Sequence, residues 1–354
     1  MKKNFWSDKT VLITGHTGFK GSWLSLCLNS LGAKVIGYSK DIPTNPSLFK
    51  LADVSSGIKT IKGDIRDYKK IYDVIIKSEP DIIFHLAAQS LVRESYSNPR
   101  NTFETNVMGT VNIFDTLRKN ERKQVIVNVT SDKCYLNEGF DKEYIEDDPL
   151  GGLDPYSSSK SCSELITMAY RNSFFDIENK KFLASVRAGN VIGGGDWAKD
   201  RLIPDIIQSI FNKKSIKIRN PDAIRPWQHV LDPLNGYILL AEKIWVHGKK
   251  YCQPWNFGPD DQGKSVSWLV EKISEMLEKK CIFISDNKDE PYESKILKLN
   301  SEKAKKNLGW EPKINIQKGL ELTAEWYKEY KNNSNMRKVT EKQIDTFFQH
   351  KKYE

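Results

Sequence analysis

The chain has 354 residues, of which 39% are hydrophobic and 29% are charged, as in a soluble globular protein of two domains or of one elaborated domain. No run of about 18 apolar residues is present, which excludes a spanning helix. The N-terminal residues 1–8 lack the apolar stretch of a secretory signal. The net charge of +9 comes from scattered lysines among 46 acidic residues. We interpret it as compositional bias or as attraction to a diphosphate substrate, and we expect no nucleic-acid or membrane partner.

The cysteines form no Cys-x-x-Cys pair, and their number is odd: Cys27, Cys134, Cys162, Cys252 and Cys281. A disulfide framework or a zinc site is therefore not expected. Reduced thiols in a cytoplasmic protein are the simpler interpretation.

The first half of the chain alternates short apolar runs with helical patterns, as a doubly wound parallel sheet requires. We expect six strands buried on both faces. The expected strands are 11–14, 34–38, 58–61, 81–86, 124–129 and 182–187, and the expected helices are 18–31, 68–77, 103–117 and 155–174.

After about residue 188 this rhythm ends in a glycine-rich loop, and the chain from residue 265 onward is helical and rich in Lys and Glu. We therefore expect a dinucleotide-binding domain over residues 1–187, completed by residues 225–258. A smaller mixed domain over residues 188–224 and 259–354 would bind the substrate. The polar tail beyond about residue 331 is expected to be loosely packed.

The first strand runs into a loop whose glycines are spaced Gly-x-x-Gly-x-x-Gly, at Gly15, Gly18 and Gly21. Such a loop turns tightly, lets the backbone approach a pyrophosphate, and starts a helix whose amides face the anion. Its position between a first strand and a first helix predicts dinucleotide binding. Lys20 either reaches the cofactor phosphates or is solvated.

The end of the second strand decides between NAD and NADP, because a carboxylate there selects the free ribose. Asp41 follows Gly21 by 20 residues and favours NAD, whereas Ser39 and Lys40 could meet the phosphate of NADP. We favour NAD. Asp64, just after the third strand, either helps to hold the adenine or is an ordinary turn acid.

Tyr156 and Lys160 lie four residues apart near the start of a predicted helix, so both side chains point from one face. Asp154 and Pro155 suit the cap and first turn, which places Tyr156 at the positive helix end. A phenol ionises near pH 10, so it needs such cationic surroundings to act as a base at neutral pH. The second pair with this spacing, Tyr327 and Lys331, is expected on a solvated face.

The fifth strand ends in Ser131, Asp132 and Lys133, at the edge where an open α/β sheet binds ligands. An adjacent acid and base is what water elimination requires, although a salt-bridged surface turn is the alternative. His85 at the end of the fourth strand is expected to be a packed core residue, and the small Ala87 and Ala88 after it let a cofactor lie close.

These motifs resemble those of the extended short-chain dehydrogenases that act on nucleotide sugars, over nearly the whole chain. Within that family the sequence is similar to the 4,6-dehydratases that take CDP-glucose. The resemblance rests on the stretches 15–23 (GHTGFKGSW), 63–67 (GDIRD), 130–135 (TSDKCY), 185–200 (SVRAGNVIGGGDWAKD) and 225–230 (RPWQHV). Related dTDP-glucose dehydratases carry a glutamate in place of Lys133.

The resemblance implies a mechanism in three steps. Tyr156 takes the proton of the sugar C4 hydroxyl as hydride passes to NAD. Lys133 removes the C5 proton while Asp132 protonates the C6 hydroxyl, which leaves as water, and hydride then returns to C6. Ser131 would bind the C4 oxygen and Lys160 the nicotinamide ribose.

The resemblance also implies the residues that bind ligands. Besides Tyr156 and Lys160, the implied cofactor-binding residues are Gly15, Thr17, Gly18, Phe19, Lys20, Gly21, Asp64, Ile65, Ala87, Ala88 and Gln89. The implied substrate-binding residues are Gln89, Arg93, Asn190, Arg219 and Arg225. No metal site is implied. Segment 290–294 lacks an arginine that dTDP-sugar enzymes place there, which puts a second phosphate clamp in doubt.

Relatives commonly form homodimers, or dimers of dimers, through the helices that correspond to 103–117 and 155–174. Two other functions remain open from the residues alone. A nucleotide-sugar C4-epimerase or decarboxylase would need Tyr156 and Lys160 but no acid and base beside them. A non-catalytic dinucleotide-binding protein would need neither pair.

Overall fold

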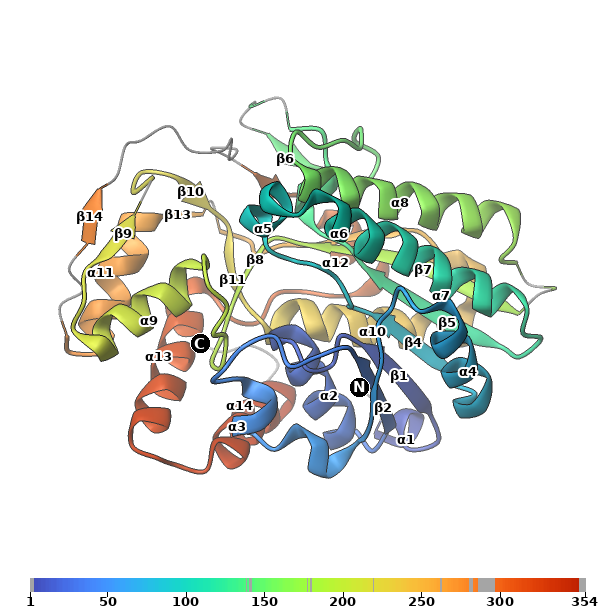
Figure 1. The fold of residues 1–354 in the computed structure, drawn as a ribbon, viewed down its shortest axis with the longest axis horizontal. Coiled ribbons are helices and arrows are strands. Elements are labelled where there is room, and N and C mark those ends of the chain that lie inside the picture. The colour runs from blue at the N-terminus through green and yellow to red at the C-terminus, as the bar shows by residue number, and fades with distance from the viewer. Residues whose placement is uncertain are drawn as a thin grey trace.

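The computed structural model describes residues 3–137, 139, 142–176, 178, 180–218, 220–261, 263–279, 283–285 and 297–349. Its centre is a seven-stranded parallel sheet (Figure 1) in the order β12-β7-β5-β4-β1-β2-β3. The order reverses between β1 and β4, the point at which such sheets bind ligands. The strands are β1 (Thr10–Thr14), β2 (Lys34–Ser39), β3 (Lys59–Lys62), β4 (Ile82–His85), β5 (Gln124–Val129), β7 (Lys181–Ala188) and β12 (Pro254–Phe257).

Helices cover both faces of the sheet, because successive strand residues point to opposite sides. Val11 and Val125 pack in the same core as α2 and α10, whereas Leu12 and Ile126 pack in a second core with α4, α7 and α8. The doubly wound fold predicted from the sequence is confirmed. The covering helices are α2 (Phe19–Ser30), α10 (Leu231–His247), α4 (Tyr68–Ser78), α7 (Gly109–Arg118) and α8 (Pro155–Ser173).

The helix expected over 103–117 differs from the prediction. It begins earlier, with α6 (Pro99–Phe103), and passes through a π-helical turn at Glu104–Met108 before α7. The side chain of Asn106 in that turn binds the backbone of Gln89 and the hydroxyl of Ser159 at 2.8–2.9 Å. The extra residue of a π-helical turn rotates the side chain of Asn106 toward these partners. Helical periodicity alone does not predict such a turn.

The remaining elements lie mostly beyond the carboxyl edge of the sheet (Figure 1). Four two-stranded pairs occur there: β6 (Glu143–Tyr144) with β15 (Lys298–Leu299), β8 (Asn190–Ile192) with β11 (Trp227–His229), β9 (Ile216–Ile218) with β14 (Phe283–Ser285), and β10 (Ile224–Arg225) with β13 (Lys264–Ser265). The longer helices are α9 (Leu202–Asn212), α11 (Val266–Met276), α13 (Ile316–Lys331) and α14 (Met336–Gln349). Short helices are α1 (Lys3–Trp6), α3 (Leu48–Leu51), α5 (Val92–Ser97) and α12 (Glu302–Leu308), and the 3₁₀ turns are Val54–Gly57, Asp132–Cys134 and Gly248–Tyr251.

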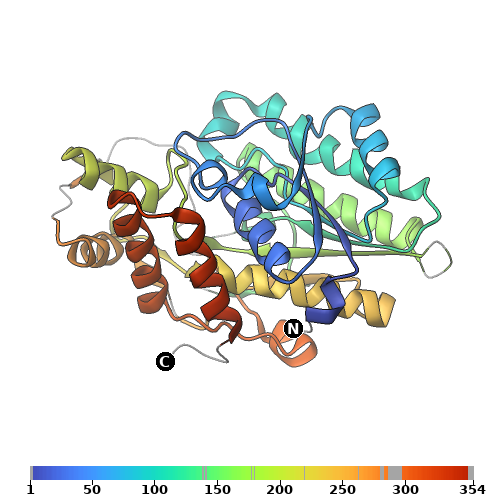
Figure 2. The same cartoon turned by 90° about the horizontal axis from the view of Figure 1, so that it is seen from below.

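The tail beyond residue 331 is packed, contrary to the expectation from its polarity. It forms α14, which runs beside α13 and near α2 (Figure 2). Ile344 and Phe347 are fully buried, and the Trp326 indole donates to the Thr340 hydroxyl at 3.0 Å. Arg337 also reaches the backbone oxygen of Asp53 at 2.8 Å. The apolar residues of this segment are few, but they fall on one helical face.

Among the described residues, the cysteines at 27, 134, 162 and 252 are free thiols. The same part of the chain contains no cluster of His, Cys, Asp and Glu that could hold a metal ion. None of the helices described there is both long and apolar enough to cross a membrane.

Replacing Phe347 with Ala is expected to lower the free energy of unfolding by about 3 kcal/mol, because the change leaves a cavity between α14 and the core. The control is Asp345→Ala in the same helix, where the side chain is exposed and the expected change is within about 0.5 kcal/mol. Urea denaturation measures both. Equal stabilities of the two variants would contradict the packing of the tail.

Candidate functional site

One cavity of about 1380 Å³ opens at the carboxyl edge of the sheet. It exceeds the usual volume of a site for one small ligand, about 300–1,000 Å³, so it can hold two molecules. Every site residue predicted above that the structure describes lines this cavity. Arg219 and segment 290–294 lie outside the described residues.

The glycine loop forms one wall of the cavity, and its shape depends on two missing side chains. A Cβ on Gly21 would lie 2.2 Å from the Gly15 oxygen, and one on Gly15 would lie 2.8 Å from the Ala87 nitrogen. A Cβ on Gly18 would meet only the Gly15 oxygen at 3.4 Å. Gly18 caps the 12-residue helix α2, whose first amides face the cavity. This cradle fits a dinucleotide pyrophosphate.

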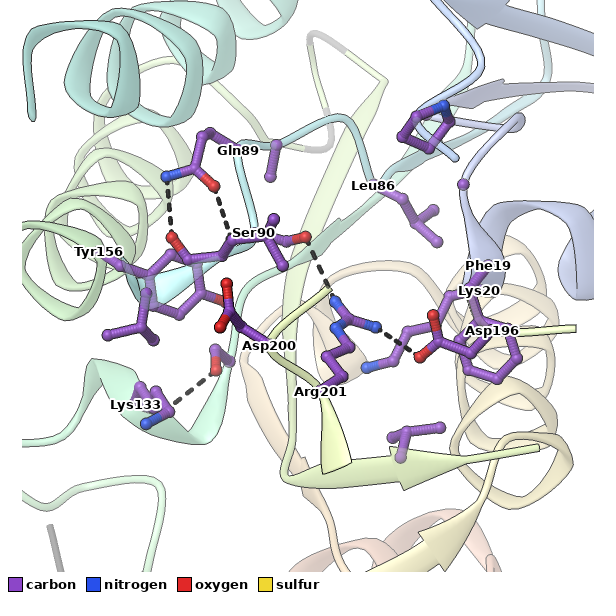
Figure 3. Close-up of a pocket in the computed structure, with 18 of the residues that line it drawn as sticks. Phe19, Lys20, Leu86, Gln89, Ser90, Lys133, Tyr156, Asp196, Asp200 and Arg201 are labelled. Atoms are coloured by element: carbon purple, nitrogen blue, oxygen red, sulfur yellow. Dashed lines mark hydrogen bonds and ion pairs between the residues drawn. The ribbon is translucent and has the colours of Figure 1, made fainter. Parts of the chain in front are cut away.

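Lys20 points into the cavity rather than into solvent, toward Arg201 (Figure 3). Burial lowers the pKa of its ammonium to about 8, with Arg201 acting in the same direction and Asp132 opposing it. This position favours the first of the two alternatives left open by the sequence, contact with the cofactor phosphates, which stays a prediction.

The end of β2 carries charges that are already paired. Lys62 lies 3.7 Å from Asp41, and Lys40 lies 3.7 Å from Asp64. The Ser39 hydroxyl is 2.8 Å from the ring of the buried His16, which the sequence did not single out. Ser39 is therefore occupied within the protein, which makes it a poor ligand for the extra phosphate of NADP.

Asp64 is held in the cavity wall by Arg66, at 2.6 Å between Oδ2 and Nη2. The hydrogen bond to Arg66 keeps the pKa of this carboxyl at about 2. Ile65 is buried beside it. Asp64 and Ile65 form a turn that also borders the cavity. Asp64 is thus a turn acid, and its contact with the adenine stays a prediction.

Tyr156 and Lys160 project from the first turns of α8, and Asp154 caps the helix by accepting from the Ser157 amide at 3.0 Å, as predicted. Burial raises the pKa of Tyr156 to about 12, whereas Ser131 and Arg201 act to lower it. Burial lowers the pKa of Lys160 to about 8. Its ammonium donates to the Val129 oxygen at 3.2 Å.

Ser131, Asp132 and Lys133 follow β5 and face the same cavity as Tyr156. The Ser131 hydroxyl donates to Asp132 Oδ1 at 2.9 Å and accepts from the Lys133 amide at 3.2 Å. Burial raises the pKa of Asp132, although Lys133, Ser131 and Lys20 oppose the rise. The cavity thus brings together a phenol, a buried carboxyl and two amines, in a form that favours proton transfer.

The segment after β4 also lines the cavity. The His85 ring is 2.7 Å from the Thr14 hydroxyl and is buried, as expected for a core residue, and burial lowers its pKa to about 3. The amide of Gln89 is engaged within its own loop, with Leu91 and with the Thr102 hydroxyl at 2.9 Å. Gln89 therefore shapes the part of the cavity wall that it forms, where contact with both cofactor and substrate was predicted.

Two ionic contacts join residues that line the cavity, and Figure 3 shows the one between Arg201 and Asp196. Arg93 lies 3.6 Å from Asp200. Arg201 pairs with Asp196 at 3.0 Å and donates to the Ser90 hydroxyl at 3.3 Å. Asn190 at the start of β8 and Arg225 in β10 line the opposite wall; Arg225 donates to the Ile224 oxygen at 3.0 Å.

Sequence reasoning missed Arg201 and Asp196. Asp196 belongs to the distinctive glycine-rich stretch, and Arg201 directly follows it, which was the available signal. The prediction for Tyr327 was wrong, because this side chain is fully buried and its hydroxyl donates to the Asp196 oxygen at 2.5 Å. Tyr327 thus fixes the loop that carries Asp196.

Comparisons with known proteins agree with this geometry. The family model described as GDP-mannose 4,6 dehydratase matches residues 12–323. A CDP-glucose 4,6-dehydratase of Salmonella typhimurium is 47% identical over 98% of both chains. A probable dTDP-glucose 4,6-dehydratase of Sinorhizobium fredii is 26% identical over 90% of this chain and 93% of the relative.

Two solved structures share the fold. A dTDP-glucose 4,6-dehydratase of Bacillus anthracis in complex with NAD has a TM-score of 0.76 at 24% identity, over 93% of this chain and 99% of that one. An epimerase of Methanothermobacter thermautotrophicus has a TM-score of 0.82 at 23% identity, over 95% and 96%. With a family match across most of its length and a dehydratase at 47% identity, the chain belongs to the GDP-mannose 4,6 dehydratase family of extended short-chain dehydrogenases.

Proposed function

We propose that the protein is an NAD-dependent sugar-nucleotide 4,6-dehydratase that converts CDP-glucose to CDP-4-dehydro-6-deoxyglucose and water. The observation that carries the proposal is the common cavity of Tyr156, Asp132 and Lys133. An epimerase of this fold needs the tyrosine but no neighbouring acid and base. The 47% identity to a CDP-glucose dehydratase supports the choice of substrate.

NAD fits the cradle formed by Gly15, Gly18 and Gly21, and when bound it supplies a hydride acceptor at C4 and a hydride donor to C6. The loop amides would hold the pyrophosphate, with Thr17 and Phe19 beside it. Asp64 and Ile65 would border the adenine, and Ala87 and Ala88 the rest of the dinucleotide. The engaged Ser39 and the acidic Asp41 support NAD over NADP.

Tyr156 is the base that takes the proton of the C4 hydroxyl. Burial raises the pKa of its phenol, so nearby cations have to favour the phenolate for it to work near neutral pH. Lys160, Arg201 and the start of α8 supply such charge. Ser131 donates to the C4 oxygen and aligns it with the phenol.

Lys133 and Asp132 carry out the elimination. Lys133 takes the proton from C5, which the C4 ketone has made acidic. Asp132 gives its proton to the C6 hydroxyl, and the C6–O bond breaks to release water. Burial favours the protonated form of Asp132 that this step needs.

Asn190 and Arg225 would hold the sugar diphosphate, together with Arg219, and Gln89 and Arg93 would border the hexose. An arginine fork suits phosphate oxygens, and Arg225 lines the cavity. We assign residues 1–187 with 225–258 to the dinucleotide domain, and 188–224 with 259–354 to the substrate domain. We also infer a cytoplasmic location, which the odd number of cysteines and the lack of a Cys-x-x-Cys motif support.

Incubation with CDP-, dTDP-, GDP- and UDP-linked hexoses, one at a time, tests the function. We expect CDP-glucose to give a 4-keto-6-deoxy product, detected by its alkaline absorbance, at a kcat/KM well above that of the others. A product that keeps the C6 hydroxyl would instead identify an epimerase and contradict the proposal.

Lys133→Ala is expected to reduce dehydration by about 10²- to 10⁴-fold, because the C5 proton loses its base. Oxidation at C4 should persist in part, so reduced nicotinamide accumulates on the enzyme and is seen by its absorbance. Lys69→Ala, at an exposed position of α4, is the control and should behave as wild type. Normal dehydration by Lys133→Ala would remove Lys133 from the mechanism.

We further propose a homodimer formed through α6, α7 and α8. A dimer of dimers would use other surfaces. These adjacent helices expose large apolar side chains: Phe103 at 37%, Met108 at 50%, Leu165 at 47% and Met168 at 44%. A second copy of the chain would cover this surface.

Leu165→Asp is expected to convert the dimer to a monomer, because it places a charge in the apolar contact. Val246→Asp, at a side chain that is 61% exposed on α10, is the matched control and should stay dimeric. Sedimentation velocity measures both. A Leu165→Asp protein that sediments as wild type would exclude this interface.

A further inference from the structure

A fully buried ion pair lies beneath the cavity and joins Glu164 of α8 to Arg187 of β7. Two parallel hydrogen bonds connect them, Nη2 to Oε2 at 2.9 Å and Nε to Oε1 at 3.0 Å, and both side chains are 3% exposed. Removing two charges from water is costly, so a buried pair is weak evidence for a role in stability. The other hydrogen bonds of Glu164 and Arg187 indicate a role in positioning the neighbouring chain.

Glu164 also accepts hydrogen bonds from two hydroxyls. Thr130 Oγ1 donates to Oε1 at 2.5 Å, and Ser185 Oγ donates to Oε2 at 2.7 Å. Thr130 directly precedes the segment Ser131–Lys133. Glu164 therefore holds the entrance of the segment that carries the proposed acid and base.

Arg187 holds the exit of the same segment. Its Nη1 donates to the Tyr135 hydroxyl at 2.7 Å and to the Glu146 oxygen at 3.1 Å. The Tyr135 hydroxyl in turn donates to Asn256 Oδ1 at 2.8 Å. The guanidinium also lies over the Tyr135 ring, 4.8 Å from its centre. One ion pair thus grips both ends of a six-residue stretch, 130–135.

Glu164 also lies one helical turn after Lys160, on the same side of α8. Burial acts to raise the pKa of Glu164, but Arg187 and the hydroxyl donors outweigh it and hold the pKa below its ordinary value. The carboxylate is therefore charged where it faces Lys160. The other titratable groups near Lys160 are Tyr156 on its own helix, Cys134, Lys20 and the neutral His85.

We propose that Glu164 and Arg187 are positioning residues of the catalytic centre: together they fix segment 130–135 against α8, and the Glu164 carboxylate keeps Lys160 cationic. This inference rests on the proposed dehydratase function. Neither residue lines the cavity, so neither is expected to touch a ligand.

The electrostatic part predicts a shift in the pH profile. Burial lowers the pKa of Lys160 to about 8, and the Glu164 charge opposes that fall. Without the charge the pKa falls further, and the loss of a nearby opposite charge is worth on the order of 1 unit. Because Lys160 works as a cation, kcat is lost as pH rises through this pKa. The alkaline limb of the kcat profile of Glu164→Gln should therefore move about 1 unit to lower pH.

The geometric part is tested by Tyr135→Phe, which removes the hydroxyl contacts with Arg187 and Asn256 at the exit of the segment and leaves the ion pair in place. We expect kcat to fall about tenfold, with KM and the alkaline limb near their wild-type values. Arg187→Lys should restore part of the activity that Arg187→Met loses, because it keeps the charge but not the fork.

Asp232→Asn is the matched control. Asp232 is another buried carboxyl, bound to the Lys313 and Ile314 amides, and it lies outside the cavity lining. It should lose stability without any shift of the alkaline limb. Thermal melting accompanies each variant, so that a loss of folding is recognised; if Glu164→Gln does not fold, the kcat of Tyr135→Phe decides the proposal.

A direct titration of Lys160 uses competitive acylation of the full-length chain across pH, read by mass spectrometry. The acylation midpoint of Glu164→Gln should fall with the kcat limb. An unchanged midpoint and limb, or a Tyr135→Phe enzyme with wild-type kcat, would overturn the proposal. A wild-type chain that dehydrates no nucleotide sugar would instead contradict the proposed function. The acylation curve would still measure the effect of Glu164 on the pKa of Lys160.

Discussion

The cavity depends on how closely the first turn of α2 packs on the chain that leaves β1. Gly21 rests directly on the Gly15 carbonyl, and Gly15 rests on the backbone at Ala87, at separations that no side chain could tolerate. This contact brings β1, β4 and α2 to one point at the reversal of the strand order. The glycine loop then faces the ends of β5 and α8 across a single space, and the ligand-binding and proton-transferring groups share it.

Within that space, exclusion of water shifts the protonation of several groups. Burial is the largest cause of the pKa shifts at Lys20, Asp132, Tyr156 and Lys160. It raises the pKa values of the carboxyl and the phenol and lowers those of the two amines. Neighbouring opposite charges limit these shifts. Burial thus favours the protonated carboxyl that a general acid needs, whereas the phenolate of Tyr156 depends on the cations around it.

Much of the fold followed from local sequence. Apart from 103–117, the expected strands and helices of the first half lie within about one residue of those observed, because their periodicity and the glycine loop are local signals. The proposed catalytic residues were recognised for the same reason, since they follow a strand end and a helix cap. Long-range contacts decided the rest. The π turn serves Asn106, whose partners Gln89 and Ser159 lie elsewhere in the chain, and the tail is ordered by the burial of Ile344 and Phe347.

Long-range contacts also explain why the sequence did not reveal the buried residues that support the candidate site. Glu164 and Arg187 are ordinary charged residues in the sequence, and only the packing of β7 beside α8 makes them a pair. Tyr327 was misplaced because its partner, the carbonyl of Asp196, comes from a loop 131 positions away.

The arginines at the cavity mouth already have carboxylate partners, Asp200 for Arg93 and Asp196 for Arg201. An incoming anion that engages either guanidinium competes with a resident carboxylate for its N–H donors. The net gain in free energy is then reduced by any resident contact that weakens. A multidentate anion that also contacts other groups of the cavity gains more from this competition than a single small ion does.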